Sequence, residues 1–461
     1  MPRSETKAAQ VAARLMSQIS DGRLPPGSRL PSLRQASGEF GVSKNTMVEA
    51  YDRLVAQGVL VARAGAGFYV QPRRILPQPP AAGRLKEAAD AASLLTEQLE
   101  RRFRTRIGEG RPSAEWHEGA VITKHLRMAI TEGGGGLRPD YDPPSGYAAL
   151  RKTLATRLSE RSIDAGTDNV LLTLGANHAF DLIIRQYLRL GDAVLVDSPG
   201  YYPLFAKLKL AGLTLIPVPR GPHGPDPQAL ARAAETSGAR FFFTQSLAHN
   251  PTGTSLNMST AGDILRIADR FDLTIIEDDI FGDLMPPTAP RLAALDRLRR
   301  VLLVSSFSKT LPAGLRVGYI AGPPALMAEL CSLKMLTVVN SCGYSERIVH
   351  AVLTDGSYRR HIRTLQARVR NASAQATTLA ARLRLSITLE TEGGYYGWLR
   401  LPEGTDDLAL ARQAATQDIF LAPGSIFFPS GVSEGGNWLR LNIAYAGDPH
   451  FAAFMESTLG P

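Results

Sequence analysis

A lysine with the surroundings of a carbonyl-binding amine lies at position 309. It occurs in SSFSKTLPAGLR, residues 305–316, directly after the apolar run VLLV. A lysine amine can form a Schiff base with a carbonyl compound. Ser306, Ser308 and Arg316 add hydroxyls and a bidentate cation, which suit a phosphate group. This stretch therefore indicates a ligand with a carbonyl and a phosphate.

Further polar groups follow other apolar runs, where predicted strands end. Gly175, Ala176 and Asn177 open a helix, so their free backbone N–H groups can hold a phosphate. Tyr201 offers a flat aromatic face, and Asp278 can pair with a ring cation. Each residue alone also fits a simpler role, as a strand cap, a turn or a surface group. Together they match the phosphate, pyridinium nitrogen and aldehyde of pyridoxal 5′-phosphate (PLP).

Apolar runs that alternate with helical patterns must position these groups. This alternation, from residue 167 onward, is typical of a doubly wound α/β sheet. Ligands bind outside the carboxyl ends of the strands in such sheets, where residues far apart in sequence meet. The predicted strands are NVLLTLG, DAVLVDS, RFFFTQS, LTIIEDD and RVLLVSSFSK.

The first seventy residues predict three short helices and two β runs. Val11, Leu15 and Ile19 lie four apart, on one face of a helix spanning residues 7–20. Two further helices, capped by serines and stopped by glycines, flank residues 40–42 and form a helix-turn-helix. The β runs on either side of residues 64–67 predict a wing.

This N-terminal region has a chemistry suited to double-stranded DNA. Residues 1–75 contain eleven Lys/Arg and five Asp/Glu, a net charge of +6, which marks a candidate polyanion binder. The second helix of a helix-turn-helix places its N-terminus in the major groove. A three-helix packing module would show the same hydrophobic pattern, but the basic excess favours DNA. The residues expected at the DNA are Arg34, Ser43, Lys44, Asn45, Thr46, Arg63 and Gly67.

Composition and length narrow the class of protein. The chain has 461 residues, of which 44% are hydrophobic, enough for about three domains. No signal peptide or membrane span is indicated, so a cytoplasmic protein is expected. Cys331 and Cys342 lack the spacing of a disulfide framework or zinc site and are expected to be buried thiols. No metal site is expected.

The expected domain organisation has three parts. Residues 1–72 form the winged helix-turn-helix, residues 73–110 a linker, and residues 111–461 the ligand-binding and dimerisation body. The linker prediction rests on the proline-rich RRILPQPPAAG, followed by a charged helix over residues 84–106.

The N-terminal module resembles a known family. Residues 22–70 are similar throughout to the winged helix-turn-helix of GntR regulators, from GRLPPGSRLPSLR through GVSKNTMVEAYDRLVAQG to the wing GAGFYV. The resemblance implies DNA binding.

From about Leu137 onward, the chain resembles the fold-type I aminotransferases of class I/II, with a large doubly wound domain and a small C-terminal α+β domain. The resemblance implies that Asn250 of HNPTG bonds the phenolic oxygen of PLP, Asp278 pairs with its ring nitrogen and Lys309 forms the Schiff base. It also implies that Tyr201 stacks on the ring, and that Ser306 and Arg316 bind the phosphate.

Two further residues are matched through the same resemblance. Arg440 in NWLRLNIAYA corresponds to the arginine that clamps an amino acid's α-carboxylate. Tyr141 corresponds to a tyrosine that reaches the phosphate of the neighbouring subunit, which implies a homodimer. One position departs from the family: Phe281 replaces a tyrosine that hydrogen-bonds the phenolic oxygen. This change should raise the pKa of the cofactor imine and hinder proton transfer.

A GntR-type module joined to an aminotransferase-like body resembles the MocR subfamily of transcriptional regulators. The resemblance implies a regulator whose body senses PLP, or a PLP adduct with an amino acid or amine. An active PLP-dependent aminotransferase with a DNA-binding arm is the alternative, favoured by Lys309, Asn250 and Arg440. A degenerate dimerisation body without cofactor is a third possibility, against which Lys309 and Asp278 argue.

Overall fold

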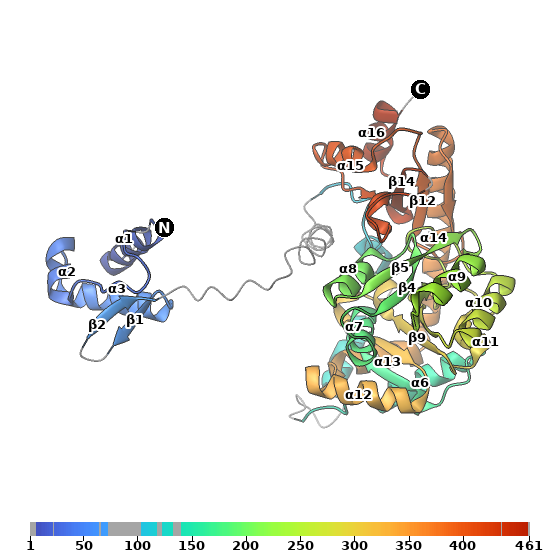
Figure 1. The fold of residues 1–461 in the computed structure, drawn as a ribbon, viewed down its shortest axis with the longest axis horizontal. Helices are drawn as coiled ribbons and strands as arrows, with labels where there is room; N and C mark the ends of the chain where they lie inside the picture. Colours follow the sequence, from blue (N-terminus) through green and yellow to red (C-terminus); the bar gives the residue numbers. More distant parts are fainter. Residues whose placement is uncertain are drawn as a thin grey trace. The chain divides into compact units, whose positions relative to one another are not determined.

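The computed structural model describes residues 6–21, 23–63, 66–71, 103–117, 122–131, 140–434 and 436–459. The chain divides into two compact units, Met1–Ala82 and Gly83–Pro461 (Figure 1). None of the helices in these described ranges is long and apolar enough to span a membrane.

The first unit is a winged helix-turn-helix. Its elements are α1 (Lys7–Ser20), α2 (Leu33–Phe40), α3 (Lys44–Ala56), β1 (Leu60–Arg63) and β2 (Gly67–Val70). The two strands pair antiparallel, and the described part of the wing lies on both sides of residues 64 and 65. The three helices and two β runs expected from the sequence are therefore present.

Local capping explains where the helices of this unit begin and end. Ser32 and Gln35 form a capping box at the start of α2, and Gly41 ends that helix with a φ of 62°. Such a left-handed backbone conformation is readily adopted only by glycine. The Ser43 side chain accepts a hydrogen bond from the Thr46 backbone N–H and so caps α3.

The second unit is built on an eight-stranded sheet with the order β3-β10-β9-β8-β7-β4-β5-β6. Neighbouring pairs from β9 to β5 run parallel, whereas β10 is antiparallel to both β3 and β9. All five predicted apolar runs form strands of this sheet. The bounds are β3 Val170–Thr173, β4 Ala193–Ser198, β5 Thr214–Gly221, β6 Gly224–Pro225, β7 Phe241–Gln245, β8 Thr274–Asp278, β9 Val301–Ser306 and β10 Gly318–Ala321.

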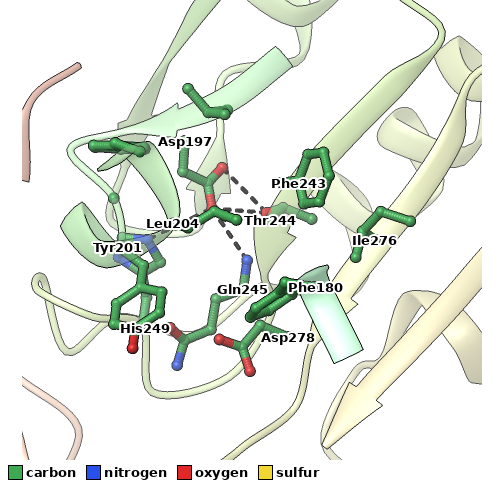
Figure 2. A pocket seen from close by; sticks show the side chains of 13 residues that line it. Phe180, Asp197, Tyr201, Leu204, Phe243, Thr244, Gln245, His249, Ile276 and Asp278 are labelled. Carbon is green, nitrogen blue, oxygen red and sulfur yellow. Dashed lines mark hydrogen bonds and ion pairs between the residues drawn. The ribbon is translucent and has the colours of Figure 1, made fainter. Parts of the chain in front are cut away.

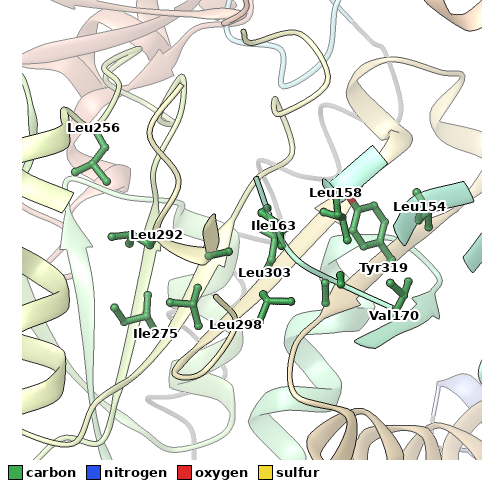
Figure 3. Close-up of a cluster of buried hydrophobic side chains, with 14 of the residues drawn as sticks. Leu154, Leu158, Ile163, Val170, Leu256, Ile275, Leu292, Leu298, Leu303 and Tyr319 are labelled. Carbon is green, nitrogen blue, oxygen red and sulfur yellow. The ribbon is translucent and has the colours of Figure 1, made fainter. Parts of the chain in front are cut away.

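Helices cover both faces of this sheet (Figure 1). Alternate strand residues face opposite sides: Leu195 of β4 packs in the cluster of α6, α9 and α10, whereas Val194 and Val196 pack against α7 and α8. Figure 3 shows part of the first cluster, where Ile275 and Leu303 project from the sheet. The helices are α5 Ile122–Thr131, α6 Ala148–Ser159, α7 Ala176–Tyr187, α8 Tyr202–Leu210, α9 Pro227–Ser237, α10 Met258–Arg270, α11 Leu292–Asp296, α12 Pro324–Val338 and α13 Gly343–Thr354.

A smaller α+β region completes the second unit. Its four-stranded antiparallel sheet has the order β11-β12-β14-β13 and packs with the long helix α14. The elements are α14 Ser357–Arg382, β11 Ile387–Leu389, β12 Tyr396–Arg400, α15 Asp407–Ala415, β13 Ala422–Pro423, β14 Trp438–Asn442 and α16 Pro449–Leu459.

Two details differ from the sequence expectations. The expected linker ended at residue 110 and its charged helix at residue 106, but residues 103–106 are not helical and Ile107 is buried in the core of the small region. Thr105 forms a bridge with Ile419 because this stretch runs beside the chain entering β13. The remainder of the expected linker lies outside the described residues. Cys342 is exposed and Cys331 half-buried, so the expectation of buried thiols is wrong.

Candidate ligand-binding site

Lys309 ends a short 3-10 turn, Phe307–Lys309, that follows β9 at the carboxyl end of the sheet. Its Nζ donates hydrogen bonds to the Gly110 carbonyl oxygen at 2.6 Å and to the Tyr396 hydroxyl at 2.9 Å. The Tyr395 hydroxyl donates to the backbone carbonyl of Lys309 itself at 2.6 Å. The lysine backbone is thus anchored, while its amine is held by groups that a ligand can replace.

Four of the predicted phosphate-binding residues come together beside this turn. Arg316 donates to the Ser308 hydroxyl at 3.4 Å, and the Ser306 and Ser308 hydroxyls lie 2.8 Å apart. Gly175 has a φ of 90°, and a Cβ there would lie 2.6 Å from Nη2 of Arg316. Glycine is therefore required at this position. The cluster presents a guanidinium and hydroxyls at the start of a helix.

The helix is α7, and it begins at Ala176 with no side-chain cap. The first N–H groups of an uncapped helix are available to an anion, and the helix dipole favours negative charge there. Asn177 in the first turn hydrogen-bonds the side chain of Tyr201. Ala176 and Asn177 thus lie between the predicted phosphate-binding residues and the predicted stacking residue.

Tyr201 and Asp278 line one pocket (Figure 2). Asp278 ends β8 and is 7% exposed, and one of its oxygens accepts the Ile280 backbone N–H at 3.2 Å. Burial raises the pKa of this carboxyl to about 7, with the ionic charge of Lys309 acting in the opposite direction. Burial also raises the pKa of the Tyr201 phenol.

A second carboxylate at the strand ends has a structural partner. Asp197, at the end of β4, forms a 2.9 Å ion pair with the fully buried Arg220 and accepts hydrogen bonds from Thr244 and the Gln245 N–H (Figure 2). Its oxygens are committed within the protein. Asp278 is therefore the better partner for a ligand cation at this edge of the sheet.

Arg440 lies on β14 and is 1% exposed. It donates to the Asn250 side-chain oxygen at 3.2 Å and to the Gly108 carbonyl at 2.6 Å, while its Nε has no hydrogen-bond partner among the described residues. The guanidinium lies over the ring of Tyr396, 4.7 Å from its centroid. Tyr396 therefore contacts both Arg440, through its ring, and Lys309, through its hydroxyl.

One segment, residues 106–111, contacts both cationic side chains. Gly110 accepts from Lys309 and Gly108 from Arg440, and Asn442 donates to the carbonyls of Glu109 and Arg111 at 3.0 and 2.7 Å. The sequence places residues 106–110 of this segment in the expected linker and residue 111 in the expected body. The segment acts through backbone carbonyls, which leave no side-chain pattern in the sequence.

Tyr396 was also missed by the sequence reading. It belongs to the doublet YY of EGGYYGWLR, and the alternation of a strand sends the two rings to different places. Phe281 is fully buried, and Lys309 Nζ lies 5.9 Å from its ring centroid. The lysine amine thus has a phenylalanine on one side and a phenol, that of Tyr396, within hydrogen-bond distance.

Tyr141 does not join the site within the single chain. Its side chain is 81% exposed, and the neighbouring Asp142 is paired with Arg347 at 2.8 Å. No group of three or more His, Cys, Asp or Glu side chains in the described part of the chain is arranged to hold a metal ion.

The predicted DNA-contacting residues lie in the other unit. Lys44 and Asn45 are exposed at the start of α3, and Arg34 is exposed on α2. Arg63 lies over the Tyr69 ring, 4.6 Å from its centroid, in the strand pair of the wing. The Ser43 and Thr46 hydroxyls hydrogen-bond each other at 2.8 Å. The side chains of Lys44 and Asn45 are thus free to contact DNA, whereas the hydroxyls of Ser43 and Thr46 are engaged in capping α3.

Comparison with known proteins gives this arrangement a family. Residues 106–450 match the family described as aminotransferase class I and II, and residues 7–70 match bacterial regulatory proteins of the gntR family. The chain belongs to the aminotransferase class I and II family. Its N-terminal region adds a gntR-family helix-turn-helix, which gives the chain a MocR-like architecture.

Relatives of the chain include both a transcriptional regulator and an aminotransferase. The HTH-type transcriptional regulator YdfD of Bacillus subtilis strain 168 is 28% identical over 455 residues, covering 95% of this chain and 93% of that protein. The 2-aminoadipate transaminase of Thermus thermophilus is 29% identical over 317 residues, covering 67% of this chain and 78% of that enzyme. The chain is a transcription regulator with an aminotransferase-like domain.

Solved structures agree with the fold. The α-aminoadipate aminotransferase LysN of Thermus thermophilus, complexed with N-(5′-phosphopyridoxyl)-L-leucine, superposes with a TM-score of 0.72 at 25% identity. The match covers 81% of this chain and 97% of that one. Aminotransferases of this fold are PLP-dependent.

The aminotransferase-like domain of this chain fits that cofactor. Asp278 is a buried carboxylate with a raised pKa and no cation within hydrogen-bond distance among the described residues. A pyridinium N–H would supply the missing counter-charge. Beside Gly175, the guanidinium of Arg316 supplies a positive charge suited to a phosphate.

Proposed function

We propose that the protein is a ligand-responsive transcription regulator. It binds DNA through its helix-turn-helix and senses PLP, or PLP joined to an amino acid or amine, through its aminotransferase-like domain. The observation that carries this proposal is segment 106–111, which accepts hydrogen bonds from both Lys309 and Arg440. The same segment is joined in the chain, through residues 72–102, to the helix-turn-helix unit.

The residues that would hold PLP are assigned by their chemistry and, for Asn250, by the resemblance to aminotransferases. Asp278 pairs with the ring nitrogen, Tyr201 covers the ring face and Asn250 bonds the phenolic oxygen. The phosphate group is held by Gly175, Ala176, Asn177, Ser306, Ser308 and Arg316. When bound, PLP supplies an aldehyde that condenses with amines, so that an amino compound can compete with the protein lysine.

Ligand binding must replace contacts of segment 106–111. For Lys309 to react with a carbonyl, its Nζ must give up the hydrogen bond to Gly110 and lose a proton to water, while the Tyr396 hydroxyl at 2.9 Å orients the amine by accepting a hydrogen bond. A ligand carboxylate can bind Arg440 through its Nε, which has no partner in the described part of the chain, and compete with the Gly108 carbonyl for the guanidinium. A buried arginine binds a carboxylate more strongly than a neutral carbonyl.

This exchange provides a physical route from the ligand to the DNA. Releasing segment 106–111 changes where the linker leaves the body, and any difference in DNA affinity between the two states is a coupling free energy. A typical coupling of about 1–3 kcal/mol alters DNA affinity by about 5- to 150-fold.

We also propose that the functional unit is a homodimer. Tyr141 is 81% exposed and lies in a stretch anchored by the Asp142–Arg347 ion pair. In a dimer, its hydroxyl would reach the phosphate group in the neighbouring subunit. Mixed dimers of Tyr141→Phe and Lys309→Ala chains should then contain one intact site and bind as much PLP as mixed dimers of wild-type and Lys309→Ala chains, whereas they would bind less if Tyr141 acted within its own chain.

The proposal is tested by DNA binding of the full chain without PLP, with PLP, and with PLP plus a panel of amino acids and amines. Arg440→Gln should abolish the response to amino acids and leave the response to PLP. Arg400→Gln, an exposed arginine on the same small sheet, is the matched control. DNA affinity that is the same in all ligand conditions would refute a sensor.

An active aminotransferase is the second candidate. Its specific support is Tyr396, whose hydroxyl lies 2.9 Å from Lys309 Nζ although Phe281 lacks one. Incubation with amino and keto acid pairs separates the two functions. Many turnovers per site would establish an enzyme, whereas a single slow half-reaction would fit a sensor.

A further inference from the structure

The N-terminal half of α14 carries an exposed arginine face. The helix Ser357–Arg382 contains six arginines and neither Asp nor Glu. Arg359, Arg360, Arg363 and Arg370 are all exposed, and no ion pair to any of them is found among the described residues. We call these four residues the α14 arginine face.

Helical spacing brings these side chains together. Arg359, Arg363 and Arg370 are separated by four and seven residues, which places them on one stripe, and Arg360 flanks it. The opposite side of the helix, including Leu365 and Val369, is fully buried. The stripe therefore points to solvent over about 16 Å of helix.

This arrangement is unfavourable for the isolated helix. Arg359 and Arg360 occupy the third and fourth positions of α14, where the helix dipole disfavours cations, and the first turn contains no acidic residue. Arg359 and Arg363 also form a like-charge pair of the spacing that destabilises helices. The nearby Asp355 is already bound by His125 at 2.9 Å and Lys124 at 3.7 Å.

The charges thus lack a partner within the described protein. The other basic side chains of the helix differ: Arg382 pairs with Glu456 at 2.7 Å, and Arg368 donates to the Glu115 carbonyl at 2.6 Å. The four arginines of the face have no such partner among the described residues. A linear polyanion could bind all four of them together. Over about 16 Å of axis, one strand of B-DNA carries about five phosphates.

We propose that the α14 arginine face binds the phosphate backbone of double-stranded DNA, as a second contact outside the helix-turn-helix. The inference rests on DNA binding by the gntR-family region, which brings a duplex to the protein. Arginine–phosphate contacts of this kind position DNA without reading its sequence. They would add affinity for DNA that extends beyond the footprint of the helix-turn-helix.

The test uses the PLP-saturated full chain and random-sequence duplexes, since backbone contacts need no operator. One duplex is about 20 bp long, close to two half-sites, and the other is about three times longer. The test variant combines Arg359→Gln, Arg363→Gln and Arg370→Gln. The control combines Lys152→Gln, Arg232→Gln and Arg412→Gln, which removes the same charge from exposed positions on three other helices.

On the long duplex, three lost phosphate contacts should lower the slope of log affinity against log salt by about 2.7. Between 50 and 200 mM salt, wild-type affinity should therefore fall about 40-fold more than that of the test variant. On the short duplex the two should agree, and the control should follow the wild type on both. Equal melting temperatures establish that the variants are folded.

Three outcomes would overturn the inference. Equal salt slopes of wild type and test variant on the long duplex would show that the face does not touch DNA. An equal loss in the control would assign the effect to net charge, and an equal loss on the short duplex would place the arginines inside the helix-turn-helix footprint. Failure of the wild type to bind either duplex would refute DNA binding itself, whereas Lys44→Ala should weaken binding to both.

Discussion

In the helix-turn-helix unit, Lys44 and Asn45 are exposed at the start of α3, whereas Lys309 and Arg440 in the aminotransferase-like body donate to backbone carbonyls at 2.6 Å. The first pair is ready for an outside partner and loses only water on binding. The second pair must exchange an internal partner for a ligand. A site of the second kind is suited to a switch, because occupancy changes the protein's own contacts.

The largest expected effect separates the two regions by their lysines. Lys309→Ala should abolish the visible absorption band of lysine-bound PLP, because no amine remains at the site to react with the aldehyde. Because it also removes the hydrogen bond to Gly110, it should move DNA binding of the cofactor-free chain toward that of the PLP-bound wild type. Absorption spectra with a titration of DNA binding check both results.

Lys44→Ala is the reciprocal variant. It should keep the absorption band, weaken DNA binding and reduce the salt slope by about 0.9, the contribution of one phosphate contact. If Lys309→Ala still formed the band, another residue would be the reacting lysine. Unchanged DNA binding in Lys44→Ala would remove α3 from the DNA interface.

Glycine substitutions compare the two regions through their effects on the free energy of unfolding. Gly253, in the HNPTG turn, has a φ of 63°, and a Cβ there would lie 2.4 Å from the Tyr396 carbonyl oxygen and 2.9 Å from Leu389 Cα. Gly253→Ala should cost about 4–5 kcal/mol of unfolding free energy, because backbone must move and the left-handed conformation is strained.

The matched change in the helix-turn-helix is Gly38→Ala, on α2. A Cβ at Gly38 meets no atom within 4 Å. Alanine should therefore stabilise that unit by about 0.5–1 kcal/mol through its higher helix propensity. Denaturant unfolding followed separately for the two units measures both changes. A Gly253→Ala protein as stable as the wild type would contradict a tightly packed turn beside Tyr396.

Sequence patterns predicted the parts of the molecule that depend on side-chain type. The apolar runs gave the strands, and Ser32, Ser43 and Gly41 marked helix ends because capping is a local interaction. The proposed PLP-binding cluster is predicted from polar groups at strand ends, and that assignment stays a prediction. Segment 106–111 could not be predicted in the same way, because Gly108 and Gly110 contribute backbone carbonyls over sequence distances of 332 and 199 residues.

Asp278 gives a prediction with a defined pH dependence. Burial raises its pKa from 3.8 to about 7, so the folded, cofactor-free protein binds this proton more tightly than the unfolded chain does. Ionisation of Asp278 therefore lowers the free energy of unfolding. This loss grows as the pH rises from about 4 to about 7 and is complete above that range. Asp278→Asn should raise the unfolding free energy at pH 8 by up to about 4 kcal/mol.

The same substitution, Asp278→Asn, should weaken PLP binding, since an amide cannot balance the ring cation.

At pH 5.5 the gain in unfolding free energy from Asp278→Asn should shrink to about half. Asp164→Asn, at an exposed position, is the control and should show no such gain. Denaturant unfolding of the cofactor-free chain at both pH values decides the matter, and a gain that does not change with pH would contradict the burial effect.

A further small effect concerns the N-terminal cap of α3. Ser43→Ala should destabilise the helix-turn-helix unit by about 1 kcal/mol, because the Thr46 N–H loses its partner at 3.2 Å. Ser43→Asp retains a good cap and should restore that stability, but it adds a negative charge where α3 is expected to meet phosphates. DNA affinity should therefore fall more in the aspartate variant than in the alanine variant, although the aspartate variant is the more stable of the two. Thermal unfolding and DNA titration together measure this reversal. If affinity instead followed stability in both variants, the N-terminus of α3 would be a folding element only, and the contrast between an outward-facing DNA surface and an inward-facing ligand site would lose its main support.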